Sequence, residues 1–423
     1  MRTLAKDLSK ETGKTAVLMG WIHRIRELGG VSFVVLRDRS GQVQLVYDGK
    51  VEWTLETVIK VTGQVVANEK APGGVELRVT QTDVLGEAEI DVPIPINQDL
   101  SNFGLDKILD HRHIAVRNPK IRSIFTLQAA ILQYFGEYLR SEDFTEIKTT
   151  KLTGTGAEGG TGLFEVEYFE NKVYLAQSPQ LYKETMVSSG MERVFEIGQA
   201  YRAEKHDTPR HLNEYVSLDV EMAFIESEHE LMDLERRILS YIFKNVAEKH
   251  QDILDTWGAT VPTPEQVATF PVIAHEDAKK IASEILGHRI FEINPEAERV
   301  ICDWSLEKYG CDGVFINEFP RKKRPFYAYP LGLKTMSFDL IFRGLEITTG
   351  GRRINEYRMM KETLPKFGLT EAGLGWFLEV LKYGCPPHGG FAIGLERLTQ
   401  KILGLTNVKE ASLFPRDRKR ILP

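Results

Sequence analysis

Residues 194–224 read VFEIGQAYRAEKHDTPRHLNEYVSLDVEMAF. Apolar side chains lead into this stretch at Val194–Ile197 and out of it at Tyr215–Val220, which predicts two strands joined by a long polar loop. The loop carries Arg202, Glu204, Lys205, His206, Arg210 and His211. Such cations suit a phosphate-bearing ligand, and a carboxylate and a tyrosine ring suit an attached base. A solvated hairpin loop explains the same residues, so both interpretations stay open here.

A second stretch, GGFAIGLERLTQ at residues 389–400, favours the ligand-binding interpretation. Its pattern predicts a glycine-rich turn, a short apolar strand and a helix that Gly394 opens, with Glu396 and Arg397 in the first helical turn. A buried strand and helix with an incidental arginine is the plain alternative. Together, YRAE, RHLNEY and GLERL resemble motifs 2 and 3 of the class II aminoacyl-tRNA synthetases, in the order that this family has them. The resemblance implies an α+β catalytic domain, with an antiparallel sheet flanked by helices.

The composition is that of a globular chain with two or three domains, since 42% of its 423 residues are hydrophobic and 27% are charged. No apolar run reaches membrane-spanning length, and the polar start MRTLAKDLSKETGK does not resemble a signal peptide. The three cysteines show no CxxC spacing, so we expect no disulfide framework, no zinc site and a cytoplasmic location. A net charge of −6 does not exclude a tRNA partner, because basic clusters lie at Arg321–Arg324 and Arg416–Arg420.

Residues 1–85 contain alternating segments separated by glycine and proline turns, which predict five short strands. Five strands in this length predict a barrel of OB type, a fold that binds single-stranded oligonucleotides on one face. We expect that face to carry His23, Arg24, Arg26, Phe33 and Gln44. Each alone is more often ordinary surface. The run GWIHRIRELGGVSFVVLRDRSGQVQ, however, resembles the anticodon-binding domain of class IIb synthetases, which implies that Arg26, Phe33 and Gln44 contact the central anticodon base.

The rest of the chain divides into a linker and a catalytic domain. Residues 86–110 hold scattered prolines and little periodicity, which is typical of a hinge. The resemblance implies that residues 111–423 form the class II catalytic domain. Within it, residues from about 226 to 300 carry helical patterns without recognisable chemistry, and we interpret them as an insertion.

Apolar residues at helical spacing predict a helix over residues 121–139, followed by a strand at Phe144–Leu152. This pair stands where class II synthetases have motif 1, the dimer element, so the resemblance implies a homodimer. Thr150 replaces the proline that this motif has before its lysine. Because a proline fixes the backbone at the subunit interface, its loss weakens the inference of a dimer.

Residues 154–159, GTGAEG, satisfy the dinucleotide fingerprint GxGxxG but lack the helix that must follow it. We expect instead a glycine-rich lid from which Glu158 reaches into a pocket. The next motif, AQSPQLYK, places Gln180 and Lys183 on one face of a helix that Pro179 starts. A solvated lysine is the plain alternative. The motif resembles the amino-acid pocket of the aspartyl branch, which implies that Lys183 contacts the substrate's side-chain carboxylate.

The stretch SFDLIFRGLEITTGGRR places Asp339 and Glu346 seven residues apart, on two short strands broken at Arg343–Gly344. Two carboxylates beside a phosphate site suit Mg²⁺, although solvated edge-strand carboxylates are the commoner explanation of such a pair. The resemblance implies that both are metal ligands and that Arg353 grips the substrate's side-chain carboxylate. Asn355 stands where the family has histidine, which leaves the hydrogen bonding around that arginine open.

The resemblance implies a full set of site residues. Catalysis would depend on Arg202 and Arg397. ATP would contact Arg202, Glu204, Arg210, His211, Leu212, Tyr215, Glu346, Gly394 and Arg397. Aspartate would contact Glu158, Gln180, Lys183, Asp219, Thr349 and Arg353. Adenylate formation needs positioning and charge stabilisation more than a protein base, which accounts for a site of arginines and carboxylates.

Two cations, Lys183 and Arg353, match a carboxylate substrate, because an amide would leave buried charge unpaired. The SLDVEM stretch around Asp219 also resembles the pattern of the aspartyl branch. The asparaginyl branch has a sequence similar to EPEM at this position. The compact length and RGLEITTGGRR resemble the archaeal and eukaryotic aspartyl type. This implies activation of L-aspartate with ATP and Mg²⁺ and its transfer to tRNA(Asp), and leaves open whether tRNA(Asn) is charged too.

Three alternatives remain at this stage. An asparaginyl synthetase of class IIb shares most of the motifs. A non-catalytic paralogue that binds RNA would have lost site residues, yet Arg202, Glu204, Asp339, Glu346 and Arg397 are all present. An ATP-dependent asparagine synthetase of the same descent would lack the N-terminal barrel.

Overall fold

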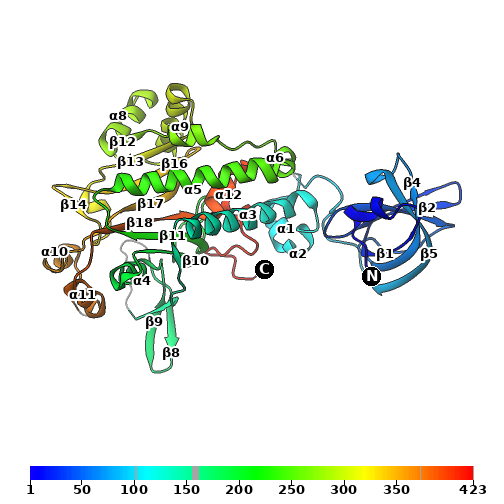
Figure 1. Cartoon of the computed structure of the whole chain (residues 1–423), viewed down its shortest axis with the longest axis horizontal. Helices are drawn as coiled ribbons and strands as arrows, with labels where there is room; N and C mark the ends of the chain where they lie inside the picture. The colour runs from blue at the N-terminus through cyan, green and yellow to red at the C-terminus, as the bar shows by residue number, and fades with distance from the viewer. Residues whose placement is uncertain (101, 155–161, 372, 423) are drawn as a thin grey trace. The chain divides into compact units, whose positions relative to one another are not determined.

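The computed structural model describes residues 1–100, 102–154, 162–371 and 373–422. The chain forms two compact units, Met1–Asn118 and Pro119–Pro423, whose elements are labelled in Figure 1. Residues 86–118, which include the stretch predicted as a linker, belong to the first unit. Within that unit, the side-chain amide of Asn97 donates to the carbonyl oxygen of His23 at 3.4 Å.

The first unit is built on a closed five-stranded barrel in the order β1-β2-β3-β5-β4. Its strands are β1 (Thr15–Leu28), β2 (Val31–Arg37), β3 (Gln42–Asp48), β4 (Val58–Ala67) and β5 (Val75–Gly86). Alternate residues point inward, so that Leu18, Val34 and Leu45 are almost fully buried. The alternation in the sequence thus produces the barrel core, and the predicted five-stranded barrel is confirmed.

The second unit is organised around an eight-stranded sheet in the order β12-β13-β16-β17-β18-β11-β10-β6. Its strands are β6 (Thr145–Glu146), β10 (Arg193–Tyr201), β11 (Glu214–Ala223), β12 (Val272–Ala274), β13 (Gly313–Asn317), β16 (Ser337–Phe342), β17 (Leu345–Arg352) and β18 (His388–Gly394). The inner pairs from β13 to β10 are antiparallel, as predicted, and the edge pairs β12–β13 and β10–β6 are parallel. The strands predicted from residues 194–224 and 389–400 are β10, β11 and β18, and β18 pairs directly with β11.

Helices α3 (Pro119–Ser141), α5 (Glu228–Lys249) and α12 (Leu395–Leu403) pack on this sheet. Figure 1 shows α3 and α5 running side by side. Their apolar faces, including Phe135 and Ile238, form one core cluster with sheet residues such as Phe338. The stretch predicted as an insertion therefore supplies α5 to the main core and β12 to the edge of the sheet.

Smaller elements complete the two units. The other helices are α1 (Leu105–Asp110), α2 (Arg112–Ala115), α4 (Gln180–Met186), α6 (Gln251–Trp257), α7 (Pro264–Ala268), α8 (His275–Leu286), α9 (Pro295–Tyr309), α10 (Tyr357–Thr363) and α11 (Gly375–Lys382). Two small sheets comprise β7 (Leu152–Thr153), β8 (Glu165–Tyr168) and β9 (Asn171–Leu175), and β14 (Pro330–Leu331) and β15 (Lys334–Thr335). Throughout the described ranges, no helix is both long enough and apolar enough to cross a membrane.

The strand predicted at Phe144–Leu152 is wrong in its extent, because only its two ends are β6 and the start of β7. The middle of the segment makes other contacts. Thr149 donates from its backbone amide and its hydroxyl to Glu196 at 3.2 and 2.7 Å, and Lys151 Nζ donates to the same carboxylate at 2.8 Å. These hydrogen bonds to one buried side chain replace the ladder of a continuous strand. Thr150, where the family has proline, is exposed.

Gly389 and Gly390 were predicted as a turn, but they lie inside β18. The reason is close packing. A Cβ atom on Gly390 would lie 2.0 Å from the carbonyl oxygen of Val220, and one on Gly389 would lie 2.7 Å from that of Gly351. These glycines therefore allow β18 to fit between β11 and β17, which brings motif 3 against motif 2.

Candidate active site

A cavity of about 310 Å³ opens between the loop after β10 and the elements β11, β17, β18 and α12. All nine residues predicted to contact ATP line it: Arg202, Glu204, Arg210, His211, Leu212, Tyr215, Glu346, Gly394 and Arg397. Seven more lining residues were not singled out for ATP from the sequence: Ser217, Ile347, Thr348, Thr349, Ala392, Glu396 and Val408. Apart from Val408, the cavity is therefore built from three segments, which carry motif 2, motif 3 and the Asp339–Glu346 hairpin.

Tyr215 gives part of the cavity an aromatic wall, and Asn213 binds the backbone beside it. The guanidinium of Arg202 lies 5.5 Å from the centre of the Tyr215 ring, which sits at the start of β11. The amide of Asn213 donates to the carbonyl oxygens of Arg202 and Glu204 at 2.7 and 3.3 Å. Asn213 thereby fixes both residues at the exit of β10. The sequence analysis missed this asparagine, although it lies in the RHLNEY motif.

Glu396 joins the helix of motif 3 to the strand of motif 2. Both of its carboxylate oxygens accept from the backbone amide of Val216 at 3.1 Å. Burial raises the pKa of Glu396 to about 7, against the opposing effect of that hydrogen bond. The contact holds the start of α12 against β11, so that Arg397, the next residue, lines the same cavity as Tyr215.

Two arginines of the cavity, Arg210 and Arg397, are oriented by carboxylates. Arg210 forms an ion pair with Glu298 of α9. Arg397 donates to the carbonyl oxygen of Glu346 at 2.9 Å and lies 3.4 Å from its Oε1. Burial and the nearby Arg397 lower the pKa of His211. This arrangement suits phosphate oxygens, since two fixed guanidinium groups face one region.

A β-bulge in β17 places Glu346 in the cavity, on the strand that pairs with the Asp339 strand. Leu340 pairs with Thr348 and Ile341 with Glu346, so one extra residue, Ile347, lies in β17. As a result Glu346 and Thr349 share a face although they are three residues apart, and Thr349 Oγ1 lies 3.4 Å from Glu346 Oε1. Thr349, predicted to bind aspartate, thus lines the cavity of the residues predicted to contact ATP, opposite Asp339 across the strand pair.

The residues at this bulge fit a magnesium ion shared with a nucleotide. Asp339 Oδ2 lies 2.8 Å from Arg324, and Oδ1 is buried with no hydrogen-bond partner among the described residues. Burial raises the pKa of Asp339 to about 6, with Glu346 adding to the shift and Arg324 opposing it. No group of three metal-ligating side chains occurs in the described part of the chain. Mg²⁺ is commonly bound by one or two carboxylates, with phosphate oxygens and water completing its shell.

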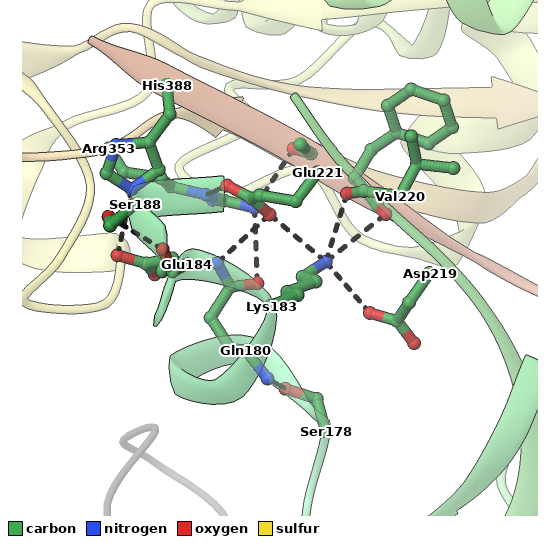
Figure 2. Close-up of polar contacts among 12 residues, drawn as sticks. Ser178, Gln180, Lys183, Glu184, Ser188, Asp219, Val220, Glu221, Arg353 and His388 are labelled. Atoms are coloured by element: carbon green, nitrogen blue, oxygen red, sulfur yellow. Dashed lines mark hydrogen bonds and ion pairs between the residues drawn. The ribbon is translucent and has the colours of Figure 1, made fainter. Parts of the chain in front are cut away.

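Beside the cavity lies a buried cluster of charges, shown in Figure 2. Lys183 of α4 donates to Asp219 Oδ1 at 2.9 Å and lies 3.4 Å from Glu221 Oε2. Arg353 donates to Glu221 Oε1 at 3.1 Å and to Gln180 Oε1 at 3.2 Å. Four residues predicted to contact aspartate therefore lie together, while Glu158 lies outside the described residues.

Glu221 is the central residue of this cluster and was missed in the sequence analysis. Burial works against its charge, but Arg353 and Lys183 together hold its pKa below the usual value. Its position two residues after Asp219 on β11 was a usable signal, because both side chains must point to the same face of the sheet. The pKa of the adjacent Arg353 is raised. Burial opposes this shift, but the nearby charge of Glu221 outweighs it.

Comparison with known protein families agrees with this geometry. Residues 105–418 match the model of class II tRNA synthetases (D, K and N), and residues 16–85 match that of OB-fold nucleic acid binding domains. The chain belongs to the class II aminoacyl-tRNA synthetases.

Several curated synthetases resemble this one along their whole length. It is 46% identical to the aspartate–tRNA(Asp/Asn) ligase of Thermus thermophilus over 425 residues, with 100% of both chains covered. It is 38% identical to the aspartate–tRNA(Asp) ligase of Pyrococcus abyssi, with 97% of each chain covered. Among solved structures, the asparaginyl-tRNA synthetase of Pyrococcus horikoshii complexed with asparaginyl-adenylate superposes with a TM-score of 0.93 at 27% identity, with 100% of both chains covered.

In the barrel of the synthetase, Arg26 and Phe33 are direct cross-strand neighbours on β1 and β2. Gln44 lies on β3, and its amide donates to Glu76 at 3.0 Å. The expectation that His23 belongs to this face is wrong. Its ring is buried and lies 3.1 Å from the guanidinium of Arg37, because a bulge in β1 turns His23 inward. Burial lowers the pKa of His23, and the positive charge of Arg37 lowers it further.

Glu235 of α5 supports the cavity from the opposite face of the sheet. Thr348 points toward α5 and donates to Glu235 Oε1 at 2.6 Å, whereas its neighbour Thr349 points into the cavity. Glu235 Oε2 is buried and has no hydrogen-bond partner within the described ranges. Burial raises the pKa of Glu235 to about 8.

We expect Glu235→Gln to stabilise the synthetase at alkaline pH and to change little near pH 5. The unfolded glutamate ionises near its ordinary pKa of 4.5, whereas the folded one keeps its proton to about 8. Wild-type stability therefore falls as pH rises through this window, by an amount on the order of a few kcal/mol, and glutamine removes that loss while still accepting from Thr348. Melting temperatures measured from about pH 5 to about pH 9 test this, with the exposed Glu248→Gln on the same helix as control. A difference that does not grow with pH would contradict it.

Proposed function

We propose that this synthetase is an aspartate–tRNA ligase that activates L-aspartate with ATP and charges both tRNA(Asp) and tRNA(Asn). The observation that carries the proposal is the buried pair of cations, Lys183 and Arg353, beside the ATP cavity. An anionic substrate side chain can replace a carboxylate partner of these cations, because it accepts the same hydrogen bonds and carries the same charge. A neutral amide replaces only the hydrogen bonds and leaves charge unpaired.

Aspartate is a zwitterion with two carboxylates, and it suits a pocket of alternating charges. Its α-ammonium would meet Asp219 and Glu158, and its side-chain carboxylate would meet Lys183 and Arg353. Lys183 and Asp219 are 2.9 Å apart. Bound aspartate would replace this ion pair with two, one between its ammonium and Asp219 and one between its side chain and Lys183. Gln180, whose carbonyl oxygen faces Arg353, would orient the same side chain.

ATP would lie with its adenine between Tyr215 and Arg397 and its exocyclic amine on Glu204. Arg202 would hold the α-phosphate, and Arg210, His211 and Arg397 would hold the outer phosphates. Asp339 and Glu346 would hold Mg²⁺, which neutralises phosphate charge when it is bound. The substrate's α-carboxylate attacks the α-phosphorus in line, forming aspartyl-adenylate and releasing pyrophosphate. The aspartyl group then passes to the 3′-terminal hydroxyl of the tRNA.

Two other assignments are weaker. An asparaginyl enzyme is supported by the similarity to the Pyrococcus horikoshii structure, but at 27% identity rather than the 46% of the Thermus thermophilus relative. A non-catalytic paralogue is opposed by the complete cavity, which retains Arg202, Glu204, Glu346 and Arg397. The choice of both tRNAs is supported by the Thermus thermophilus relative and by the Deinococcus radiodurans one, at 45% identity, since both are named for tRNA(Asp/Asn).

The assembly and location are part of the same proposal. Helix α3 and the segment after it occupy the place of motif 1, so we infer a homodimer in which Thr150 takes the place of the motif's proline. We infer a cytoplasmic enzyme, because its substrates and its reduced cysteines belong to that compartment.

We expect the purified synthetase to transfer radiolabelled aspartate, and not asparagine, to both tRNA(Asp) and tRNA(Asn). The reason is that Lys183 and Arg353 require an anionic side chain in the pocket. Aminoacylation of each tRNA with each amino acid measures this directly. Transfer of aspartate to tRNA(Asp) alone would show a discriminating enzyme. Transfer of asparagine would overturn the pocket assignment, and no transfer at all would favour the paralogue.

We expect Arg202→Ala to lower aspartate-dependent ATP–pyrophosphate exchange by about 100-fold or more, the size found when a donor to developing charge is removed. Arg202 would hold the α-phosphate at which the reaction occurs. Lys280→Ala removes an exposed cation that pairs with Asp277 on α8 and should leave exchange unchanged. Near-normal exchange in the Arg202 variant would contradict the assignment of Arg202 to the α-phosphate.

We expect Phe33→Ala to lower kcat/KM for tRNA by about 5- to 100-fold, as expected for the loss of one base–aromatic stack. Pyrophosphate exchange without tRNA should stay at the wild-type level, since Phe33 lies in the barrel unit. Phe291→Ala, which removes an exposed ring from the catalytic unit, serves as control and should affect neither rate. Equal loss of exchange and charging in the Phe33 variant would show a folding defect and contradict the anticodon role.

A further inference from the structure

A second layer of side chains lies behind the amino-acid pocket. Glu184 of α4 and His388 of β18 are almost completely buried, and His388 Nε2 lies 3.2 Å from Glu184 Oε2. The other oxygen of Glu184 accepts from Gln180 Nε2 at 2.7 Å. Figure 2 shows this pair next to Gln180 and Arg353. Nothing in the proposed reaction uses either residue.

The contacts of His388 determine its charge. Its Nδ1 lies 2.9 Å from the carbonyl oxygen of Pro386, which can only accept a hydrogen bond. Its Nε2 faces the carboxylate of Glu184, which also accepts. Both acceptors are satisfied when each ring nitrogen carries a proton, as in an imidazolium; the Cys385 thiol lies farther from Nδ1, at 3.5 Å. Burial opposes this charge, but hydrogen bonds to Cys385 and Glu184 raise the pKa of His388 to about 10.

Glu184 in turn sets the orientation of the Gln180 amide. Gln180 Nε2 donates to Glu184 and also lies 3.3 Å from Glu221 Oε2, while Oε1 accepts from Arg353. A rotated amide would direct its carbonyl oxygen at two carboxylates and its N–H groups at the guanidinium of Arg353. The rotated state is therefore excluded as long as Glu184 keeps its charge.

His388 also completes the charge balance of the pocket. The buried cations are Lys183, Arg353 and His388, and the buried carboxylates are Asp219, Glu221 and Glu184. The cluster is neutral with an imidazolium at His388 and carries one net negative charge with a neutral ring. A net negative pocket would repel a carboxylate side chain more than an amide, because the amide carries no charge.

We propose that Glu184 and His388 are positioning residues that make this pocket select a carboxylate side chain over an amide. The imidazolium balances the buried carboxylates, and the pair fixes the donor and acceptor sides of Gln180. The inference rests on the proposed aspartate pocket and extends it to two residues that lie one hydrogen bond behind it.

His388→Asn tests the charge. The variant leaves Glu184 without a cation, so we expect KM for aspartate in pyrophosphate exchange to rise at least about tenfold. KM for ATP should stay within about twofold, since the ATP cavity does not include His388. The ratio of kcat/KM for aspartate to that for asparagine should fall. His250→Asn, which removes a ring that bonds Tyr134 at 3.0 Å, is the matched control and should move neither KM.

Rescue separates a charge effect from a packing defect. The double variant Glu184→Gln/His388→Asn is neutral again, and the amide oxygen introduced at position 184 can still accept from Gln180. We therefore expect the double variant to recover a KM for aspartate within about threefold of the wild type. If His388→Asn instead caused a packing defect, the second substitution would add its own defect and raise KM further. A raised KM that the second substitution does not rescue would overturn the proposal. An unchanged KM and an unchanged aspartate preference in His388→Asn would overturn it as well.

The ring of His388 gives a readout that does not depend on activity. Nitrogen-15 spectra of the full-length wild type near pH 8 should show both ring nitrogens of His388 protonated, and Glu184→Gln should convert them to a neutral imidazole. A neutral ring in the wild type would overturn the proposal, even if His388→Asn fails to fold. A wild type with no aspartate-dependent exchange would instead sink the proposed function, so the two failures are distinguishable.

Discussion

The buried carboxylate of Glu221 connects three parts of the catalytic unit. It lies on β11, contacts Lys183 and Gln180 of α4, and accepts from Arg353 just after β17. Its side chain has no exposed surface. A buried charge costs several kcal/mol unless it is paired, so each of these cations must keep its place for the fold to persist. The helix of the SPQLYK motif and the strand of motif 2 are therefore held in register by the residues that would bind the substrate.

The same constraint shapes the ATP cavity. The guanidinium groups proposed to hold phosphate are oriented by carboxylates, Arg210 by Glu298 and Arg397 by Glu346. The bulge in β17 adds a further consequence. Thr348 is anchored to Glu235 on the helical face, and Thr349 is directed at Glu346 on the cavity face. Helix packing and the lining of the cavity thus depend on two adjacent residues.

The sequence predicted those features that depend on neighbours along the chain. Alternation predicted the barrel strands together with β10 and β11, and helical spacing predicted α3. The nine residues predicted to contact ATP all lie in recognisable motifs, and all of them line the cavity. Features that depend on distant partners were missed. Glu298 meets Arg210 from 88 residues away, and His388 meets Glu184 from 204 residues away, and no local pattern marks either pair.

Close packing and side-chain competition account for the other errors. Two consecutive glycines are typical of a turn, but at residues 389–390 they mark a strand with no room for a Cβ atom, a fact that only the neighbouring strands reveal. The segment from Phe144 to Leu152 has the composition of a strand, yet Thr149 and Lys151 bind the buried Glu196. His23 follows the alternation of β1 until a bulge turns it inward. Such bulges depend on pairing with the next strand.

Discrimination between aspartate and asparagine cannot come from shape. The two side chains are nearly isosteric, since they differ only in an oxygen against an amino group. A pocket can then separate them only through charge and through fixed donors and acceptors. Buried ion pairs seldom stabilise a fold more than apolar residues of the same volume would. A cluster of six buried charges beside a nucleotide cavity is therefore poorly explained by stability alone. It is well explained by a site that must recognise one negative charge, and whose own charges must cancel before that charge arrives.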